Sequence, residues 1–207
     1  MTRAKRRGDG RERILKAAWQ LVERGGPSTA TLARIAQTAG VSRQAVYLLF
    51  GSRSALLVAM MVDHDQRTGT ERSMIRASLR KSAGRALCEA IRIWFAYVGE
   101  IDSVAMAVQG AALSDPDAAE AWRQRMDDLY RFFRRIVERI DLADELAEGW
   151  TVDTATDFVW TQVHPSTWHN LVAERGWSVT KAANVTCSVL SRILLKIDQS
   201  NAARRAQ

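Results

Sequence analysis

The sequence has little that would break a helix: 207 residues include only three prolines and twelve glycines. Alanine, leucine, arginine and glutamate, which favour helices, are plentiful instead. No segment alternates polar and apolar residues as a half-buried strand would, and neither an internal repeat nor a coiled-coil heptad occurs in the sequence. The sequence therefore predicts an all-α fold.

Long apolar runs are also missing from the sequence. No stretch approaches the roughly 20 apolar residues that span a bilayer. The basic N-terminus is followed by an amphipathic segment and not by the apolar core of a signal peptide. We therefore expect a cytoplasmic protein that has no membrane partner.

Sequence patterns for catalysis, nucleotide binding and metal binding are absent as well. No phosphate-binding loop, dinucleotide fingerprint or nucleophile pattern is found. His164 and His169 are five positions apart, which puts them on different sides of a regular helix, and no cysteine lies near them. Cys88 and Cys187 lie far apart among apolar helical residues and are expected to be buried thiols in a reducing compartment. We expect no enzyme, no cofactor and no metal site.

Positive charge is concentrated in the first quarter of the chain. Residues 1–53 contain eleven Lys and Arg against three Asp and Glu, a balance of +8. Residues 54–207 contain nineteen against twenty, a balance of −1, so the whole net charge of +7 comes from the N-terminal part. This asymmetry indicates a module that faces nucleic acid, joined to a neutral module with another task. The arm Arg3–Arg13, with residues 1–9 expected to be flexible, either reaches DNA or is a solvated tail.

Short amphipathic helices are predicted throughout this basic segment. Apolar residues at helical spacing and capping residues before each start place the helices at residues 11–24, between Thr31 and Gly40, at residues 43–49, and from Arg53 into the sixties. Beyond them we predict helices at 83–101 and 103–113, one that begins at Pro116, one over 151–176 that Pro165 kinks or breaks, and a last one capped by Ser178.

The stretch "AGVSRQAVYL", residues 39–48, has the spacing of a helix-turn-helix. Ala36 is small enough for two helices to cross closely, Gly40 suits a positive φ in the turn, and Val46 can pack the second helix back onto the first. This register leaves Ser42, Arg43, Gln44, Tyr47 and Leu48 on the outer face of the second helix. A buried helical corner without a role in DNA binding is the alternative.

The outward residues of this second helix suit DNA. The second helix of the motif enters the major groove with its N-terminal residues nearest the bases. There Arg43 suits guanine and Gln44 suits adenine, while Tyr47 suits a phosphate. Leu48 either contacts a thymine methyl group or packs within the protein. A two-fold dimer would read a palindromic operator, one half-site for each recognition helix.

The segment "TLARIAQTAGVSRQAVYLLFGSRSALL", residues 31–57, resembles the DNA-binding signature of the tetracycline-repressor (TetR) family of bacterial transcription regulators. The resemblance is detailed over residues 11–60 and only architectural beyond. It implies a DNA-binding domain over 1–52 and a ligand-binding and dimerisation domain over 53–207. The residues that it assigns to DNA contact are Thr31, Ser42, Arg43, Gln44, Tyr47 and Arg53, and Leu48 joins the candidates by its place on the outer face.

Two positions depart from the habit of that family. Arg53 stands where the family often has lysine, which keeps the charge and hence the expected phosphate contact. Leu48 stands where a polar or aromatic residue is common, which leaves its role open.

Tryptophans and a polar stripe mark a candidate effector pocket in the second part of the chain. The chain has seven tryptophans, and large aromatic residues could line an apolar pocket between helices. The candidate pocket residues are Trp94, Met106, Gln109, Trp122, Met126, Asp157, Trp160, Thr161, His164 and Trp168. The alternatives are that the tryptophans are ordinary core and that the polar stripe faces solvent or a dimer partner.

The last predicted helix is apolar around much of its circumference, as a helix buried on more than one side would be. By the resemblance it takes part in a four-helix dimer interface; the alternative is a core within one chain. The candidate interface residues are Leu171, Ala182, Thr186, Val189, Leu190, Ile193 and Ile197.

These observations favour a ligand-responsive transcriptional regulator. The resemblance implies a repressor that binds double-stranded operator DNA as a homodimer and is released by a small apolar or aromatic effector that the sequence does not identify. The alternatives are a small-molecule-binding helical protein without sequence-specific DNA binding, an activator, or a general architectural DNA-binding protein.

Overall fold

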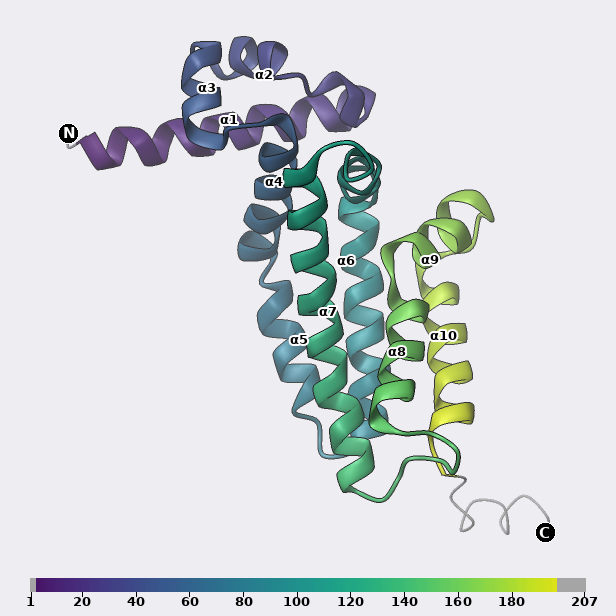
Figure 1. Cartoon of the computed structure of the whole chain (residues 1–207). Coiled ribbons are helices and arrows are strands. Elements are labelled where there is room, and N and C mark those ends of the chain that lie inside the picture. Colours follow the sequence, from purple (N-terminus) through teal and green to yellow (C-terminus); the bar gives the residue numbers. More distant parts are fainter. Residues whose placement is uncertain (1–2, 197–207) are drawn as a thin grey trace. The chain divides into compact units, whose positions relative to one another are not determined.

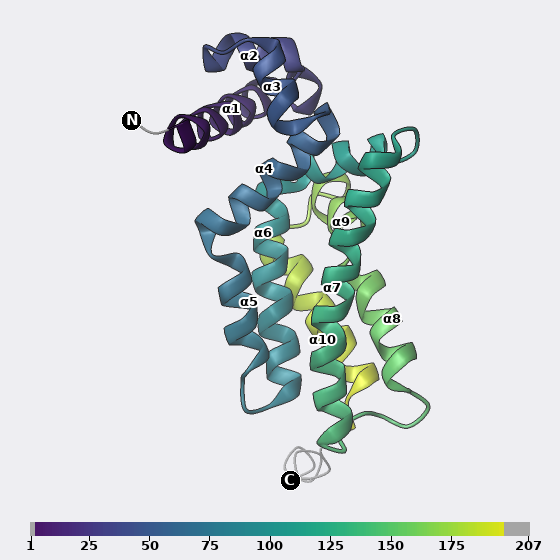
Figure 2. The same cartoon turned by 60° about the vertical axis from the view of Figure 1, so that its left-hand side comes forward.

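The computed structural model describes residues 3–196, with side chains from residue 9 onward. Helices joined by turns and loops make up these residues (Figures 1 and 2). They are α1 (Arg3–Gly25), η1 (Pro27–Thr29), α2 (Leu32–Ala39), α3 (Arg43–Phe50), α4 (Arg53–Thr68), α5 (Thr70–Ser78), α6 (Ala83–Ala111), α7 (Pro116–Leu142), α8 (Val152–Val163), α9 (Pro165–His169), the π-helical turn η2 (Asn170–Glu174) and α10 (Val179–Leu194). Residues 3–196 contain no strand, only an isolated bridge between Leu146 and Leu195. The predicted all-α fold is confirmed.

The predicted helix starts coincide with caps. Thr31, Ser42, Ser52 and Ser178 each accept a hydrogen bond from the backbone N–H three residues later. Such a bond satisfies one of the N–H groups that a helix start leaves unpaired. Asp115 caps α7 in the same way, through Ala118 and Asp117, and Pro116 takes the first helical position.

Two helix boundaries differ from the prediction. Helix α1 begins at Arg3 rather than at residue 11, so the segment expected to be a flexible arm is helical from Arg3. Helix α6 is continuous over Ala83–Ala111, where two helices were predicted. Asp102 and Ser103 resemble a helix start in the sequence, but neither breaks a helix as proline would, and the preceding turn simply continues.

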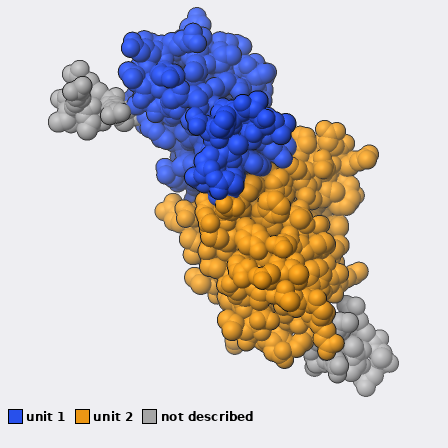
Figure 3. Space-filling view, viewed as in Figure 1, with its two compact units in different colours: residues 1–69, 101–125 blue, residues 70–100, 126–207 orange. Residues whose placement is uncertain are grey.

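The described helices form two compact units (Figure 3). Unit 1 comprises residues 1–69 and 101–125, and unit 2 comprises residues 70–100 and 126–207. Helices α6 and α7 each begin in one unit and end in the other. The functional boundary predicted between residues 52 and 53 stays a prediction.

Unit 1 is built on α1. Helices α2 and α3 lie on the same side of α1 in both views (Figures 1 and 2). Their common core contains Ile14 and Ala18 of α1, Ile35 of α2 and Val46 of α3, all fully buried. Residues at helical spacing in the sequence thus meet at one apolar centre, which holds the three helices together.

Unit 2 is a bundle. Helix α5, the first part of α6, the second part of α7, α8 and α10 run side by side (Figures 1 and 2). Phe95 and Phe133 are its largest fully buried side chains. Pro165 ends α8 and starts α9, as predicted, because its ring has no N–H for the helical hydrogen bond.

No single helix within residues 3–196 has the length and apolar composition to cross a membrane. Among these residues only α3 and α4, taken together, have that length and composition, and the two helices are bent by 69° at their junction.

Candidate nucleic-acid interface

The turn between α2 and α3 depends on Gly40. Its φ is 65°, a left-handed conformation that strains residues with a side chain. The N–H of Gly40 donates to the Gln37 carbonyl (3.2 Å) and that of Val41 to the Ala36 carbonyl (3.0 Å). These bonds satisfy the last carbonyls of α2 while the chain reverses. The tight corner predicted from the sequence therefore forms with the predicted glycine.

Helix α3 separates an apolar face from an exposed one. Val46 has no exposed surface, whereas Tyr47 and Leu48 are 61% and 70% exposed. Leu48 therefore does not pack within the chain. Arg43 and Gln44 are exposed at the start of the helix, and neither side chain has a polar partner among the described residues. Their donors and acceptors are available to a ligand outside the protein.

The exposed faces beside α3 add positive charge. Arg34 on α2, and Arg11 and Arg13 on α1, are exposed. The guanidinium group of Arg11 lies 5.7 Å from the ring centre of Phe50, so it contacts the end of α3 through a cation–π interaction. The side chains of Arg3, Lys5, Arg6 and Arg7 in the predicted DNA-reaching arm lie outside the described residues.

Arg53 holds the scaffold of this region together. Its Nε donates to the Ala30 carbonyl (3.1 Å) and its Nη2 to the Pro27 carbonyl (2.5 Å). The half-buried guanidinium group thereby links the start of α4 to the turn before α2. The sequence suggested only a phosphate contact for Arg53, and that contact stays a prediction.

We expect Arg53→Lys to lower the free energy of unfolding by roughly 1–3 kcal/mol, because one ammonium group cannot reproduce the planar fork that reaches both carbonyls. Urea titration followed by circular dichroism measures the change. Arg34→Lys is the matched control: Arg34 is exposed on α2, and its replacement should alter stability by less than about 0.5 kcal/mol. Equal stability of the two variants would show that the carbonyl contacts contribute nothing.

Comparison with known proteins relates this geometry to a family. Residues 14–60, which include α2, α3 and the turn between them, match the sequence profile of the bacterial regulatory proteins of the tetR family. This segment is therefore similar to the N-terminal domain of tetR-family regulators. This tetR-type domain contains the helix-turn-helix predicted from the sequence. No curated protein matches the chain in sequence.

Solved structures of transcriptional regulators share the fold over most of the chain. The regulator FadR from Bacillus subtilis, in complex with stearoyl-CoA, has a TM-score of 0.69 at 17% identity, covering 86% of this chain and 96% of its own. NalD of Pseudomonas aeruginosa, secondary repressor of a multidrug efflux pump, has 0.65 at 19%, covering 93% and 98%. The tetR-family regulator PfmR from Thermus thermophilus has 0.63 at 21%, covering 89% and 95%. At these identities the likeness shows the fold. The tetR-type domain is thus followed by a helical body of the kind found in these regulators.

The predicted effector residues are divided between the units. Met106, Gln109 and Trp122 belong to unit 1. Trp94, Met126, Asp157, Trp160, Thr161, His164 and Trp168 belong to unit 2. Asp157 and Thr161 are exposed, so the predicted polar stripe faces solvent at these two positions.

The tryptophans of unit 2 differ in how their indole N–H groups are paired. Trp94 donates to the Val163 carbonyl (2.7 Å), and Trp160 donates to the Met126 carbonyl (3.2 Å). The buried N–H of Trp168 has no partner among the described residues. Trp160 packs edge-on against His164, whose pKa is lowered by burial, so this imidazole is neutral at physiological pH.

This difference predicts unequal costs for the same substitution. Trp94→Phe leaves the buried Val163 carbonyl without its donor, whereas Trp168→Phe removes an N–H that is already unpaired. Because both changes remove the same atoms, we expect Trp94→Phe to cost about 1–3 kcal/mol more stability than Trp168→Phe. Thermal and urea unfolding of the two variants measure the difference, and each variant is the control for the other.

Five of the seven predicted dimer residues lie on α10, and they are divided between its buried and its exposed face. Ala182, Thr186 and Leu190 are buried within the chain, whereas Val189 is 43% exposed. Leu171 and Ile193 are half-buried, and Ile197 lies outside the described residues. The exposed face of α10 consists of Lys181, Asn184, Val185, Ser188, Val189 and Arg192. A partner would meet this face and not the buried residues of the predicted set.

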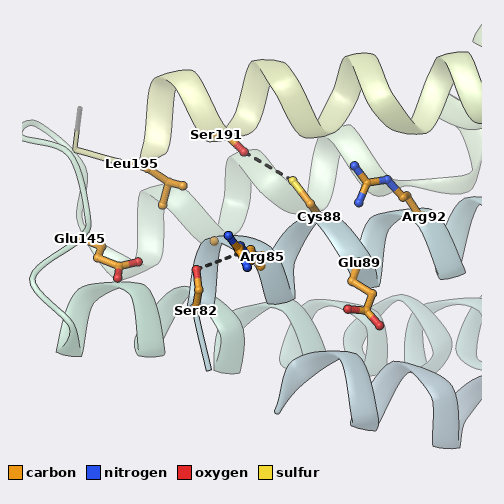
Figure 4. A pocket seen from close by; sticks show the side chains of 9 residues that line it. Ser82, Arg85, Cys88, Glu89, Arg92, Glu145, Ser191 and Leu195 are labelled. Carbon is orange, nitrogen blue, oxygen red and sulfur yellow. Dashed lines mark hydrogen bonds between the residues drawn. The ribbon is translucent and has the colours of Figure 1, made fainter. Parts of the chain in front are cut away.

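Sequence reasoning missed an open cavity in unit 2. Its volume is about 590 Å³, and none of the predicted effector residues lines it. The lining residues are Ser82, Gly84, Arg85, Cys88, Glu89, Arg92, Glu145, Ser191 and Leu195 (Figure 4). They come from the start of α6, the end of α10 and the turn after α7, and no sequence pattern connects these segments.

Proposed function

We propose that this chain is a ligand-responsive transcriptional repressor that binds a palindromic operator as a homodimer and leaves it when a small apolar or aromatic effector binds. The observation that carries the proposal is the exposed start of α3, where Arg43 and Gln44 have no partner among the described residues. Regulators of the tetR family match the domain that presents these side chains.

The chemistry of α3 supports sequence-specific binding. A guanidinium group pairs with the O6 and N7 atoms of guanine through two hydrogen bonds, and an amide pairs similarly with adenine. Exposed Arg11, Arg13 and Arg34 supply charge for phosphates, which provide affinity for any sequence. Base reading at Arg43 and Gln44 and phosphate contacts around them together make a complete interface.

The exposed face of α10 supports the dimer. Val185 and Val189 are 40% and 43% exposed on adjacent turns of the helix. Small and polar neighbours, Ser188 and Asn184, allow a second helix to approach closely. A two-fold dimer through this face would present two copies of α3 to two half-sites.

Unit 2 supports the effector site. Trp94, Trp160 and Trp168 all belong to this unit, Trp160 contacts His164, and the buried N–H of Trp168 is available as a hydrogen-bond donor. FadR, of the same fold, is described in complex with stearoyl-CoA, and NalD is described as a repressor. The first description favours a ligand with a large apolar part, and the second favours a repressor.

Selection from a random DNA library, followed by gel shift, tests the proposal. We expect a palindromic sequence to be enriched and its affinity to fall steeply with salt, because bound phosphates release counterions. Sedimentation of the complex measures whether two chains bind each operator. Binding of equal strength to all sequences would instead support an architectural DNA-binding protein. The absence of any binding would support a helical ligand-binding protein that does not bind DNA.

Effector binding is tested separately by thermal shift, with stearoyl-CoA and a panel of aromatic compounds as probes. A ligand that binds the folded state raises the melting temperature. We expect the active probe to weaken operator binding, and Trp168→Phe to reduce its effect on the melting temperature. A probe that strengthens operator binding would contradict the proposal that the effector releases the protein from DNA. A reporter gene behind the operator distinguishes a repressor from an activator.

A further inference from the structure

Two thiols that are 99 positions apart in the sequence lie together between α6 and α10. The Sγ atom of Cys187 is 3.4 Å from the carbonyl oxygen of Cys88, and the Sγ atom of Cys88 is 3.9 Å from the carbonyl oxygen of Cys187. Both cysteines are free thiols within unit 2. Because each sulfur reaches the backbone of the other cysteine, the two side chains occupy the same gap between the helices.

One of the two thiols is accessible from outside. Cys88 is half-buried and lines the open cavity of unit 2, whereas Cys187 is buried behind it. Figure 4 shows the Cys88 sulfur atom facing Ser191, whose Oγ is 3.5 Å away. A cavity of about 590 Å³ readily admits a molecule as small as hydrogen peroxide. The pair thus has a half-buried member that a reagent in the cavity reaches first, and a buried member beside it.

The surroundings favour a negative charge on the Cys88 sulfur. The Cys187 thiol can donate a hydrogen bond to it, and this bond, with smaller contributions from Ser191 and the positive charge of Arg92, lowers the pKa of Cys88 to about 6. The same bond raises the pKa of Cys187, which therefore keeps its proton. A thiolate is the reactive form towards peroxides.

The other charged groups of the cavity are mostly engaged. Arg92 on α6 donates through Nε to the Asn184 side chain on α10 (3.1 Å), which holds it beside the thiols. Glu89 is paired with Arg80 (2.6 Å). Arg85 and Glu145 complete the charged lining, one of each sign. Arg92 is the positive charge that acts on Cys88, and it also acts on the neighbouring carboxylate of Glu89.

We propose that Cys88 and Cys187 form an oxidation site, at which a hydroperoxide converts the two thiols into an intramolecular disulfide that joins α6 to α10. The proposal concerns unit 2 alone and does not depend on the proposed role in DNA binding.

The reaction balances with one peroxide molecule. The Cys88 thiolate attacks one oxygen of hydrogen peroxide, the O–O bond breaks, and a sulfenic acid forms while hydroxide takes up a proton to become water. The Cys187 sulfur then loses its proton and attacks the Cys88 sulfur. The S–O bond breaks, the S–S bond forms, and the oxygen leaves as a second water molecule. The two thiols lose two electrons, and the peroxide gains them.

Peptide mapping of the full chain tests the proposal. The reduced protein is treated at neutral pH with a small excess of hydrogen peroxide, remaining thiols are blocked with N-ethylmaleimide, and the protein is digested with trypsin. We expect peptide 86–92 to be joined to peptide 182–192, with a mass two hydrogen atoms below the sum of the two. Dithiothreitol should separate them. The number of free thiols per chain should fall from two to none, and no covalent dimer should appear.

Single-cysteine variants test the order of events. Cys187→Ala should stop at a sulfenic acid on peptide 86–92, which dimedone traps, whereas Cys88→Ala should leave Cys187 unreacted at the same peroxide concentration. Equal reaction of the two variants would overturn the assignment of Cys88 as the attacking thiol. The disulfide itself is overturned if both thiols of the unmodified chain survive peroxide that oxidises free cysteine. It is equally overturned if the only links join two chains, or if Cys88 is over-oxidised without linking to Cys187.

Discussion

Val46→Asp is expected to abolish specific DNA binding by unfolding the helix-turn-helix. Val46 has no exposed surface and packs α3 onto the core that α1 and α2 share. A carboxylate of nearly the same size would be buried there without a partner, which costs about 3–5 kcal/mol. That is a large share of the stability of a typical domain, about 5–15 kcal/mol. Urea titration by circular dichroism measures the loss, and fluorescence anisotropy with the selected operator measures binding.

Tyr47→Asp is the matched control, because it introduces the same carboxylate one residue later on the exposed face. Its stability should stay within about 0.5 kcal/mol of the unmodified protein, while its DNA affinity falls because the new charge faces phosphates. If Val46→Asp were as stable as Tyr47→Asp, the packing of α3 onto the core would not hold the motif together.

Arg43→Ala is expected to relax base preference at one position of each half-site. The side chain has no partner within the described residues, so its removal should cost no stability. If the guanidinium group binds guanine through two hydrogen bonds, the loss is about 1–3 kcal/mol, or roughly 5- to 150-fold in affinity for each half-site. Competition with operators that carry each of the four bases at every position measures the change.

Arg72→Ala serves as the control for charge. Arg72 is exposed on α5, outside the tetR-type domain, and its replacement removes the same charge. We expect a small loss of affinity that is equal for all sequences. If Arg43→Ala behaved in the same way and also reduced the salt dependence, Arg43 would contact a phosphate and not a base.

The helix-turn-helix could be predicted because its signals are local. Gly40 supplies the positive φ, and Ser42 caps α3 three residues before its hydrogen-bond donor, Ala45. Apolar spacing then decides which face of α3 is buried. The exposure of Leu48, which the sequence left open, follows from the same register once Val46 is placed in the core.

Features that depend on how distant helices pack could not be predicted. Periodicity identified α10 as apolar, but not which of its faces meets α6, so buried Ala182 and Leu190 were predicted to face a partner. For the same reason Cys88 and Cys187 were predicted to be merely buried. Their contact requires the rotation of both helices about their axes, which no local pattern specifies.

The helices of residues 1–69 are not an independent module that could be exchanged between regulators without the rest of unit 1. The chain passes between the units at residues 69–70, 100–101 and 125–126, so neither unit is one continuous segment. Within unit 1, Ser54 of α4 donates to Asp115 (2.6 Å), and Arg125 of α7 pairs with Asp65 of α4 (2.7 Å). A graft of the first 69 residues onto another body would leave Ser54 and Asp65 without these partners. Modular evolution of this DNA-binding unit therefore requires the corner between α6 and α7 to travel with it, or to be rebuilt in the recipient.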